Sequence, residues 1–484
     1  MLKTMVYLIG AGPGDPELLT QKAARVLASA DVILYDYLVH PNIVLKATSA
    51  QKVCVGKKKG AHSTQQKDIN QLLIDYAKQG KVVARLKGGD PMVFGRCGEE
   101  MQALKAEGIH YEVIPGITSA ISVPTYAGIP ITHRDHSHSV AFVTATRAND
   151  IENMAFPNAD TLIIMMSLLR LSSIVNRLKE LRPIDTPIAI IESGTYADER
   201  VVVGTISTIE LLQEKAQCQP PALIVVGDVA GLHHEFNWRE HLPLKKHRFV
   251  LFRAEHQQSE LRDTLSMMGA EVLCLSLNSI EMNPKSLEPV NLDQITHIIF
   301  TSENGVRSFF NGLFLQKKDA RLLSNKQIVA IGQHTKRTLE SFGILPDILP
   351  EKSTSEGVIQ LLKDQLTTKD HILIPTSSEA DNNLNELTNT GATVTIIPTY
   401  NNNLPKDVDT MLNWIKETDV LIFMNSASVK RLSHIYKSIV HHRVVSIGPM
   451  TTKTLTDIGS HNIIESDKPS VESIKNTILN HFSN

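Results

Sequence analysis

Residues 6–20, VYLIGAGPGDPELLT, decide the fold class of the first half of the chain. A short apolar run enters a turn that carries three glycines, and a stretch with helical spacing follows it. Glycine lets the backbone approach a ligand closely, and the start of a helix offers free N–H groups. The stretch therefore predicts a buried strand, a ligand-binding turn and a helix.

The same alternation of short apolar runs and longer amphipathic runs continues along the chain. Buried strands are short and apolar, whereas helices repeat apolar side chains every three to four residues, so this order is typical of α/β layers. The predicted strands are 5–9, 32–35, 82–86, 140–144, 161–166, 188–191 and 222–226. The predicted helices include 16–29, 66–79 and 98–107.

The composition is that of a globular protein with little net charge. The 484 residues are 42% hydrophobic, and the formal net charge is −2. Such a balance gives no overall field for nucleic acid or anionic lipid, so we expect neither nucleic acid nor membrane as a partner. Four scattered cysteines, no signal peptide and no apolar stretch of the ~18 residues that a membrane span needs favour a cytoplasmic location.

The polar residues 232–248 show neither strand nor helix periodicity, and we place the main domain boundary there, near residue 245. Beyond it the chain repeats itself. Residues 328–344 match residues 444–460 at seven of seventeen positions with a constant offset of 116. Two copies of one motif predict two similar α/β lobes with a ligand cleft between them.

A second pair of matching segments precedes the first. Residues 298–306, IIFTSENGV, resemble residues 421–429, LIFMNSASV. Each copy predicts the order strand, polar loop, helix, strand, glycine turn, helix. Ser353-x-x-Glu356 has the form of a capping box that would open the last helix of the first copy.

A second glycine turn, residues 85–96 (RLKGGDPMVFGR), follows a strand. Gly88 and Gly89 expose backbone groups, and Asp90 can accept hydrogen bonds from ligand hydroxyls or an amine. An ordinary strand-to-helix turn requires neither the Gly-Gly-Asp-Pro order nor such a density of basic residues. Three basic residues are expected to add positive charge at this site: Arg85, Lys87 and Arg96.

A third element, residues 113–119 (VIPGITS), places Thr118 and Ser119 near a helix start. A dinucleotide-binding loop is the alternative for the first glycine turn, because Asp36 ends the second strand where a ribose-binding acid would lie. The spacing is GxGxG, however, and not the GxGxxG of that fingerprint.

Taken in order, the segments VYLIGAGPGDPELLT, ILYDYLV, VGKKKG, RLKGGDPMVFGR, VIPGITSA and YAGIPITHR resemble the motif set of uroporphyrinogen-III C-methyltransferases. The resemblance covers residues 5–240 and implies two α/β subdomains that hold S-adenosylmethionine between them. The methyl group would pass twice to uroporphyrinogen III, giving precorrin-2 on the branch to sirohaem and cobalamin. The implied cofactor positions are Pro13, Gly88, Gly89, Asp90, Val93, Thr118, Ser119, Met166, Gly194 and Ala222.

The resemblance also implies catalytic roles. Asp36 and Lys57 match the family's proposed proton acceptor and donor, although Asp36 could instead be a solvated loop carboxylate. The run of lysines at 57–59 is either a solvated charge run or a holder of substrate carboxylates. Arg96 and Arg134 are further candidates for binding the polycarboxylated substrate. The family is typically dimeric, so we expect a homodimer through this half.

Four residues depart from the family pattern without removing a charge: Met92, Cys97, Ser119 and Met165. Cys97 stands where glycine is usual, and we interpret it as a tolerated small residue rather than a nucleophile. His136 and His138 would share a face of a strand, but no carboxylate or thiolate stands at ligand spacing, so we expect no metal.

The second half contains hydroxyl-rich loops at predicted strand ends, for example residues 301–304 and 376–378, but no obvious catalytic cluster. Residues 248–482 resemble uroporphyrinogen-III synthase through FTSENGV, VAIGQHTKRTL, ILIPTSSEADNNL, IPTY and SIGPMTTKTL. That family cyclises hydroxymethylbilane with inversion of ring D, and folding the substrate is most of its task.

In that resemblance Tyr400 matches the tyrosine proposed to help the hydroxyl group leave, and an interface tyrosine at a hinge is the alternative. Asn304, Thr335 and Thr451 are substrate-binding candidates by position.

The predicted domains are therefore a methyltransferase at 1–243 and a bilobed α/β synthase at 248–484, with one lobe made of 248–282 plus 401–484 and the other of 283–400. The alternative for the second domain is a bilobed tetrapyrrole-binding module without catalysis. A nicotinamide dehydrogenase is the alternative for the first domain.

Overall fold

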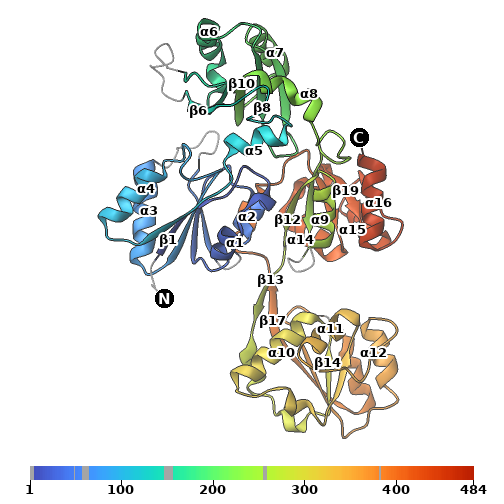
Figure 1. Ribbon diagram of the computed structural model, residues 1–484. Helices are drawn as coiled ribbons and strands as arrows, with labels where there is room; N and C mark the ends of the chain where they lie inside the picture. Colours follow the sequence, from blue (N-terminus) through green and yellow to red (C-terminus); the bar gives the residue numbers. More distant parts are fainter. Residues whose placement is uncertain are drawn as a thin grey trace. The chain divides into compact units, whose positions relative to one another are not determined.

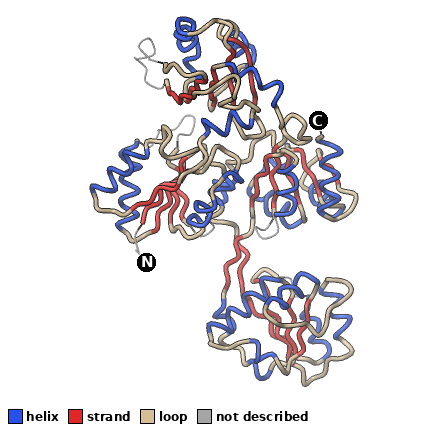
Figure 2. Tube along the Cα trace, in the orientation of Figure 1, coloured by secondary structure: helices blue, strands red, loops and turns tan. Residues whose placement is uncertain are grey.

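The computed structural model describes residues 5–47, 50–56, 65–145, 156–253, 259–380 and 383–483. Contacts divide the chain into two compact units, one made of Met1–Leu275 with Asp409–Asn484 and one made of Ser276–Val408. Among the residues that the structure describes, the first unit carries three five-stranded sheets and the second carries one. In each unit helices pack on the faces of the sheets (Figures 1 and 2).

The first sheet is wholly parallel, in the order β3-β2-β4-β1-β5. Helices cover both of its faces and form two apolar core clusters, which is why β2, VILY, is buried along its whole length. Its strands are β1 (Met5–Gly10), β2 (Val32–Tyr35), β3 (Gln51–Cys54), β4 (Val82–Lys87) and β5 (Tyr111–Ile114). Its helices are α1 (Gln21–Leu27), α2 (Pro41–Leu45), α3 (Gln66–Lys78) and α4 (Cys97–Ala106).

The second sheet is mixed, in the order β6-β7-β10-β8-β9, with only β6 and β7 parallel. The helix α5 (Ser119–Tyr126) joins the first sheet to it and packs in one of its two core clusters. The strands are β6 (Val140–Thr144), β7 (Thr161–Met165), β8 (Pro187–Glu192), β9 (Arg200–Thr205) and β10 (Ala222–Val226). The helices are α6 (Leu171–Leu181), α7 (Ile209–Ala216) and α8 (His233–Phe236).

The third sheet is parallel, in the order β12-β11-β18-β19-β20, so β12 is an edge strand. Its strands are β11 (Arg248–Phe252), β12 (Glu271–Leu275), β18 (Val420–Phe423), β19 (Arg443–Ser446) and β20 (Ile463–Glu465). Its helices are α9 (Ser259–Met267), α13 (Val408–Leu412), α14 (Ser426–Ile435), α15 (Pro449–Asp457) and α16 (Val471–Phe482).

The sheet of the second unit runs β13-β17-β16-β14-β15, with only β13 antiparallel to its neighbour. Its strands are β13 (Ser279–Met282), β14 (His297–Phe300), β15 (Gln327–Ala330), β16 (His371–Ser377) and β17 (Thr393–Asn403). Its helices are α10 (Glu303–Leu315), α11 (Gln333–Ser341) and α12 (Ser355–Leu362).

The internal repeat appears as matching secondary structure. The order β14-α10-β15-α11-α12 of the second unit corresponds to β18-α14-β19-α15-α16 of the first, and α11 and α15 start 116 residues apart. The predicted capping box is wrong by one residue. Thr354, not Ser353, is the N-cap of α12 and accepts a hydrogen bond from the Gly357 N–H, as Ser470 does from Ser473 at the start of α16.

The seven predicted strands are present, and their ends agree within one residue. The predicted helix at 16–29 is interrupted, since Leu19 is extended and Thr20 caps α1, leaving Pro16–Leu18 as a 3-10 turn. The division at 275 and 408 also differs from the lobe limits at 282 and 400. β13 was expected with the third sheet, but it pairs with the end of β17, so it belongs to the second unit.

Candidate active sites

Three glycine turns meet backbone to backbone at the carboxyl ends of three neighbouring strands. Gly12 and Gly89 exchange both backbone hydrogen bonds, at 3.2 and 2.7 Å. A Cβ atom on Gly116 would lie 2.3 Å from the Gly89 carbonyl oxygen and 2.7 Å from the Gly10 Cα. This close backbone contact leaves no room for a side chain at Gly116 or at Gly10. It brings together the three sequence motifs at the edge of the sheet where open α/β sheets bind ligands.

Asp90 joins two of these turns. Its Oδ1 accepts a hydrogen bond from the Met92 N–H at 2.8 Å, and its Oδ2 accepts one from the Gly116 N–H at 3.0 Å. Thr118 caps α5 through the Ala120 N–H, and Ser119 is the first residue of that helix. A Cβ on Gly89 would lie 3.4 Å from the Ser119 nitrogen. The structure thus places these cofactor candidates around one junction.

The loop between β8 and β9, residues 193–199, closes on the first glycine turn. The Thr195 Oγ1 accepts a hydrogen bond from the Asp15 N–H at 3.2 Å, and the Tyr126 hydroxyl donates to Asp15 at 2.8 Å. A Cβ on Gly194 would lie 2.4 Å from a methyl group of Val123 in α5. The candidate Gly194 therefore packs against the helix that Ser119 begins.

Apolar side chains remain exposed on the segments that carry the glycine turns. Leu38, Ile117 and Ile121 are between 38 and 53% exposed, and a Cβ on Gly88 would lie 3.8 Å from the Leu38 Cβ. Glycine turns beside exposed apolar groups fit a ligand that combines a polar backbone-bound part with a flat apolar part, such as an adenosine. Three further cofactor candidates are Pro13 within the first glycine turn, Val93 after the second turn, and Ala222 at the start of β10.

Met166 follows β7 in the second subdomain. It has a left-handed backbone with φ 55° and is 54% exposed, so its side chain is available to a ligand. A left-handed methionine is uncommon, because its Cβ crowds the backbone there, and such positions gather at binding sites.

Asp36 stands at the end of β2 and is partly exposed. Its Oδ1 accepts a hydrogen bond from the Arg85 Nη2 at 2.6 Å. Arg85 and Lys87 do not supply free positive charge at the site, contrary to the prediction. Both are buried and paired with the fully buried Glu100 of α4, at 3.1 and 2.8 Å. Sequence reasoning missed Glu100, since nothing in its helical spacing distinguishes it from a solvated glutamate.

Arg96 is the N-cap residue just before α4, is exposed, and makes two hydrogen bonds to Glu99 at 2.9 and 2.6 Å. Arg134 lies exposed in a turn closed by hydrogen bonds between His133 and Ser137. Lys57 and its neighbours 58 and 59 lie outside the described residues.

Cys97 is buried, and burial raises the pKa of its thiol to about 11. A thiol of that pKa stays protonated at neutral pH, which agrees with a packing role. The expected shared strand face of His136 and His138 is wrong, because His136 belongs to the turn before β6. Within the described ranges there is no group of three or more potential metal ligands. No helix among the described residues is long and apolar enough to cross a membrane.

In the second unit, Tyr400 lies among the hydroxyl-rich loops. It is 7% exposed, and its hydroxyl lies 3.0 Å from the Ser302 Oγ, which caps α10. The Ser378 N–H donates to the Tyr400 carbonyl at 3.1 Å. The tyrosine therefore contacts the loops that follow both β14 and β16, at the carboxyl edge of the sheet.

Asn304 lies in the first turn of α10, two residues after Ser302 in the chain, and is partly exposed. Thr335 and Thr451 occupy equivalent positions in α11 and α15 and are almost fully buried. Burial of both threonines leaves little of either side chain for a substrate, so their predicted binding role depends on rearrangement of these helices.

The strand order of the first sheet distinguishes the first part of the chain, which carries the glycine turns, from dinucleotide-binding folds. β4 lies between β1 and β2, so the acid that ends β2 does not neighbour the first glycine turn, as a ribose-binding acid must. The class defined by fold and sites is thus a two-subdomain α/β protein with a glycine-turn site, followed by a bilobed α/β protein with a repeated core.

Comparison with known proteins identifies these parts. Residues 5–210 match the model of the tetrapyrrole (corrin/porphyrin) methylases, and residues 259–475 match that of uroporphyrinogen-III synthase. A porphyrin biosynthesis protein HemD from Ruminiclostridium josui is 34% identical over 82% of this chain and 81% of its own length. The chain belongs to the tetrapyrrole methylase family in its first part and to the uroporphyrinogen-III synthase family in its second part.

Two further relatives match about half of the chain. An S-adenosyl-L-methionine-dependent uroporphyrinogen III methyltransferase from Methanosarcina barkeri is 50% identical over 47% of this chain and 92% of its own length. A sirohaem synthase from Pseudoalteromonas translucida is 47% identical over 48% of this chain, which spans half of that protein. The crystal structure of a uroporphyrin-III C-methyltransferase from Thermus thermophilus, 43% identical, covers 49% of this chain with a TM-score of 0.44.

Proposed function

We propose that the chain is a bifunctional enzyme of tetrapyrrole biosynthesis. Its second part cyclises hydroxymethylbilane to uroporphyrinogen III, and its first part methylates that product twice with S-adenosylmethionine to give precorrin-2. The observation that carries the proposal is the junction of three glycine turns in a chain whose two parts match families with consecutive chemistry.

In methyl transfer, S-adenosylmethionine supplies an electrophilic methyl group when bound. The glycine turns and Gly194 offer backbone groups at close range, and Asp90 and Thr118 fix the shape of those turns. A pyrrole carbon would displace the methyl group from the sulfonium, so the sulfur–methyl bond breaks as the carbon–methyl bond forms and S-adenosylhomocysteine leaves. The methylated ring would then shed a proton. Asp36, which accepts a hydrogen bond from Arg85, is the proton acceptor in this scheme.

Because displacement reactions depend on alignment and on fixed charge, a rigid junction suits this chemistry. In cyclisation, the Tyr400 hydroxyl would donate a hydrogen bond to the departing hydroxyl group of hydroxymethylbilane. The loss of water leaves a cation that closes the ring after inversion of ring D. The hydroxyls and amides of residues 301–304 and 376–378 would hold the carboxylates of the substrate.

The decisive experiment supplies the full chain with hydroxymethylbilane, with and without S-adenosylmethionine, and separates the products by mass and isomer. We expect uroporphyrinogen III without the donor, and species heavier by one and then two methyl groups with it. A cyclic type-I product that forms at the same rate without protein would contradict the synthase activity. Binding of hydroxymethylbilane without turnover would instead favour the non-catalytic module.

The proposal includes a cytoplasmic homodimer that uses no metal, which sedimentation and metal analysis of the purified chain would check. The proposal of a dimer through the first part is based on the oligomeric state that is typical of the methylase family.

A further inference from the structure

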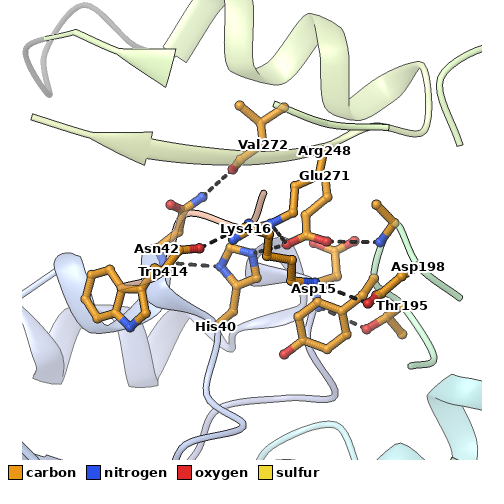
Figure 3. A network of polar contacts seen from close by, with 12 residues as sticks. Asp15, His40, Asn42, Thr195, Asp198, Arg248, Glu271, Val272, Trp414 and Lys416 are labelled. Atoms are coloured by element: carbon orange, nitrogen blue, oxygen red, sulfur yellow. Dashed lines mark hydrogen bonds and ion pairs between the residues drawn. The ribbon is translucent and has the colours of Figure 1, made fainter. Parts of the chain in front are cut away.

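We infer that Glu271, the first residue of β12, is a positioning residue for methyl transfer, although it belongs to the part of the chain that matches the synthase family. This inference rests on the proposed methyltransferase activity. The carboxylate contacts both loops that frame the glycine-turn site, so the third sheet would hold the two methyltransferase subdomains in register (Figure 3).

Glu271 reaches both subdomains of the first part. Its Oε1 lies 3.4 Å from the His40 Nε2, in the loop that leads from Asp36 to α2. Its Oε2 accepts a hydrogen bond from the Ala197 N–H at 3.0 Å, in the loop between β8 and β9. One buried carboxylate thus bridges a loop of the first sheet and a loop of the second.

The orientation of His40 is fixed by its own helix. Its Nδ1 accepts a hydrogen bond from the Asn42 N–H at 3.1 Å and so caps α2, which places the ring proton on Nε2, the atom that faces Glu271. The ring also stacks on Tyr196 at 6.0 Å. The imidazole therefore faces the carboxylate through its Nε2 at 3.4 Å and keeps its helix capped.

Glu271 is held from behind by Arg248, whose Nε donates to its Oε1 at 2.6 Å. Arg248 also donates to Asp419 at 2.6 Å and to the Trp414 carbonyl at 3.1 Å, and Trp414 packs against the core of the first sheet. These partners come from β11 and from residues near β18, so the carboxylate has its position determined by the third sheet.

A second set of contacts lies beside the first. The Asn42 side chain donates to the Val272 carbonyl at 2.7 Å and accepts from the Cys274 N–H at 3.0 Å. One side-chain amide thereby satisfies backbone groups of the exposed edge of β12, as a neighbouring strand would. Figure 3 shows Asn42 and His40 facing β12 side by side.

The contacts continue to the cofactor candidates. The Tyr196 hydroxyl donates to the Leu38 carbonyl at 3.0 Å, and the Leu38 Cβ would lie 3.8 Å from a Cβ on Gly88. Thr195 lies two residues before Ala197, the partner of Glu271, and its hydroxyl accepts a hydrogen bond from the Asp15 N–H. Ser193 and Thr195 have left-handed backbones with φ 48° and 75°, which the surroundings must hold in place. Release of Ala197 would let this loop relax away from the first glycine turn.

The test uses Glu271→Gln and Asn42→Ala in the full chain and measures both activities. Glutamine keeps an acceptor for Ala197 but lacks the charge that Arg248 and His40 face, while Asn42→Ala removes the edge contacts without stranding a charge. We expect the KM for S-adenosylmethionine to rise about tenfold in Glu271→Gln, the effect of losing one charge-assisted hydrogen bond, and by less in Asn42→Ala, which loses hydrogen bonds between neutral groups. The kcat of methyl transfer and the synthase rate should change by less than about twofold.

Lys416→Ala is the matched control, because the Lys416–Asp198 ion pair at 3.2 Å joins the same two parts but is exposed. Its kinetic constants should equal those of the parent chain. An unchanged KM in both interface variants would overturn the inference, and so would a parallel fall of both activities with the melting temperature, since that reports a structural role only. A parent chain that does not methylate uroporphyrinogen III would instead refute the proposed function.

Discussion

The Gly89 N–H donates to the Gly12 carbonyl at 2.7 Å, and the Gly12 N–H donates back to the Gly89 carbonyl at 3.2 Å. This reciprocal pair ties together two turns that lie 77 positions apart in the chain, and Gly116 packs against it without room for a side chain. The site in the first part is therefore built from backbone contacts. Replacing one of its tightly packed glycines by alanine, which adds a single methyl group, should disrupt it.

Gly116→Ala should abolish binding of S-adenosylmethionine and lower the melting temperature, because its Cβ would lie 2.3 Å from the Gly89 carbonyl oxygen. Calorimetric titration of the donor and thermal unfolding measure both effects. Gly98→Ala is the control, since nothing lies within 4 Å of a Cβ there and the residue is helical. It should stabilise the chain by about 0.5–1 kcal/mol and leave binding intact. Equal binding by the two variants would contradict the backbone junction.

Asp36→Asn should lower the kcat of methyl transfer by about 10²–10⁴, the usual contribution of a general base, with little change in the KM for the donor. Asparagine can still accept the Arg85 hydrogen bond, so the fold should persist. Glu99→Gln, at an exposed carboxylate paired with Arg96, provides the comparison and should be nearly neutral. Full activity of the Asp36 variant would show that this carboxylate pairs with Arg85 and is not the proton acceptor.

Tyr400→Phe should reduce the synthase rate and leave methyl transfer unchanged, because the lost hydroxyl lies 3.0 Å from Ser302 in the second unit. Tyr436→Phe removes a comparable hydroxyl, 2.9 Å from the His442 Nε2, and should leave both rates unchanged. Separate assays of cyclisation and methylation distinguish these results. Equal synthase rates in the two variants would favour the hinge interpretation of Tyr400.

Alkylation at pH 8 should modify Cys54 well before Cys97. Cys54 is exposed, whereas Cys97 is buried and its pKa is raised to about 11, so its reactive thiolate is scarce. Peptide mass mapping after timed treatment with iodoacetamide measures the order. Cys97→Gly should retain methyl transfer. Rapid loss of activity that follows modification of Cys97 would reopen a chemical role for this thiol.

Acid should weaken the Glu271 network in a defined direction. Burial favours a raised pKa, but the His40 contact and the Arg248 charge outweigh it and hold the pKa of Glu271 well below its usual value of 4.5. A carboxylate with a lowered folded pKa contributes stability above its unfolded pKa and loses it as the pH falls toward the folded pKa.

The parent chain should therefore melt above Glu271→Gln at pH 7, and the difference should shrink below about pH 4.5. Asp419, which also faces Arg248, has its pKa raised by burial, so its effect on stability should change with pH in the opposite direction to that of Glu271. Asp419→Asn is therefore the comparison. A melting difference that grows on acidification would refute the assignment.

Much of the fold could be predicted from the sequence. Continuous apolar runs such as VILY at 32–35 mark strands covered on both faces, and the glycine turns mark places where only backbone fits. The repeat with its offset of 116 predicted the matching order of strands and helices around α11 and α15. Thr354 shows the limit of such patterns, because Ser353 satisfies the same capping motif and only backbone geometry separates the two.

The tertiary structure decided which charges are free and which parts belong together. The sequence predicts that Arg85 and Lys87 add positive charge at the site, yet both are buried against Glu100, since the packing of α4 on the sheet brings that carboxylate to them. Likewise, the domain boundary that the sequence places near residue 245 gives no sign that Glu271, beyond it, contacts His40 and Ala197, before it. Local patterns follow from the periodicity of the chain, whereas pairing between distant charges depends on the packing of whole sheets and helices.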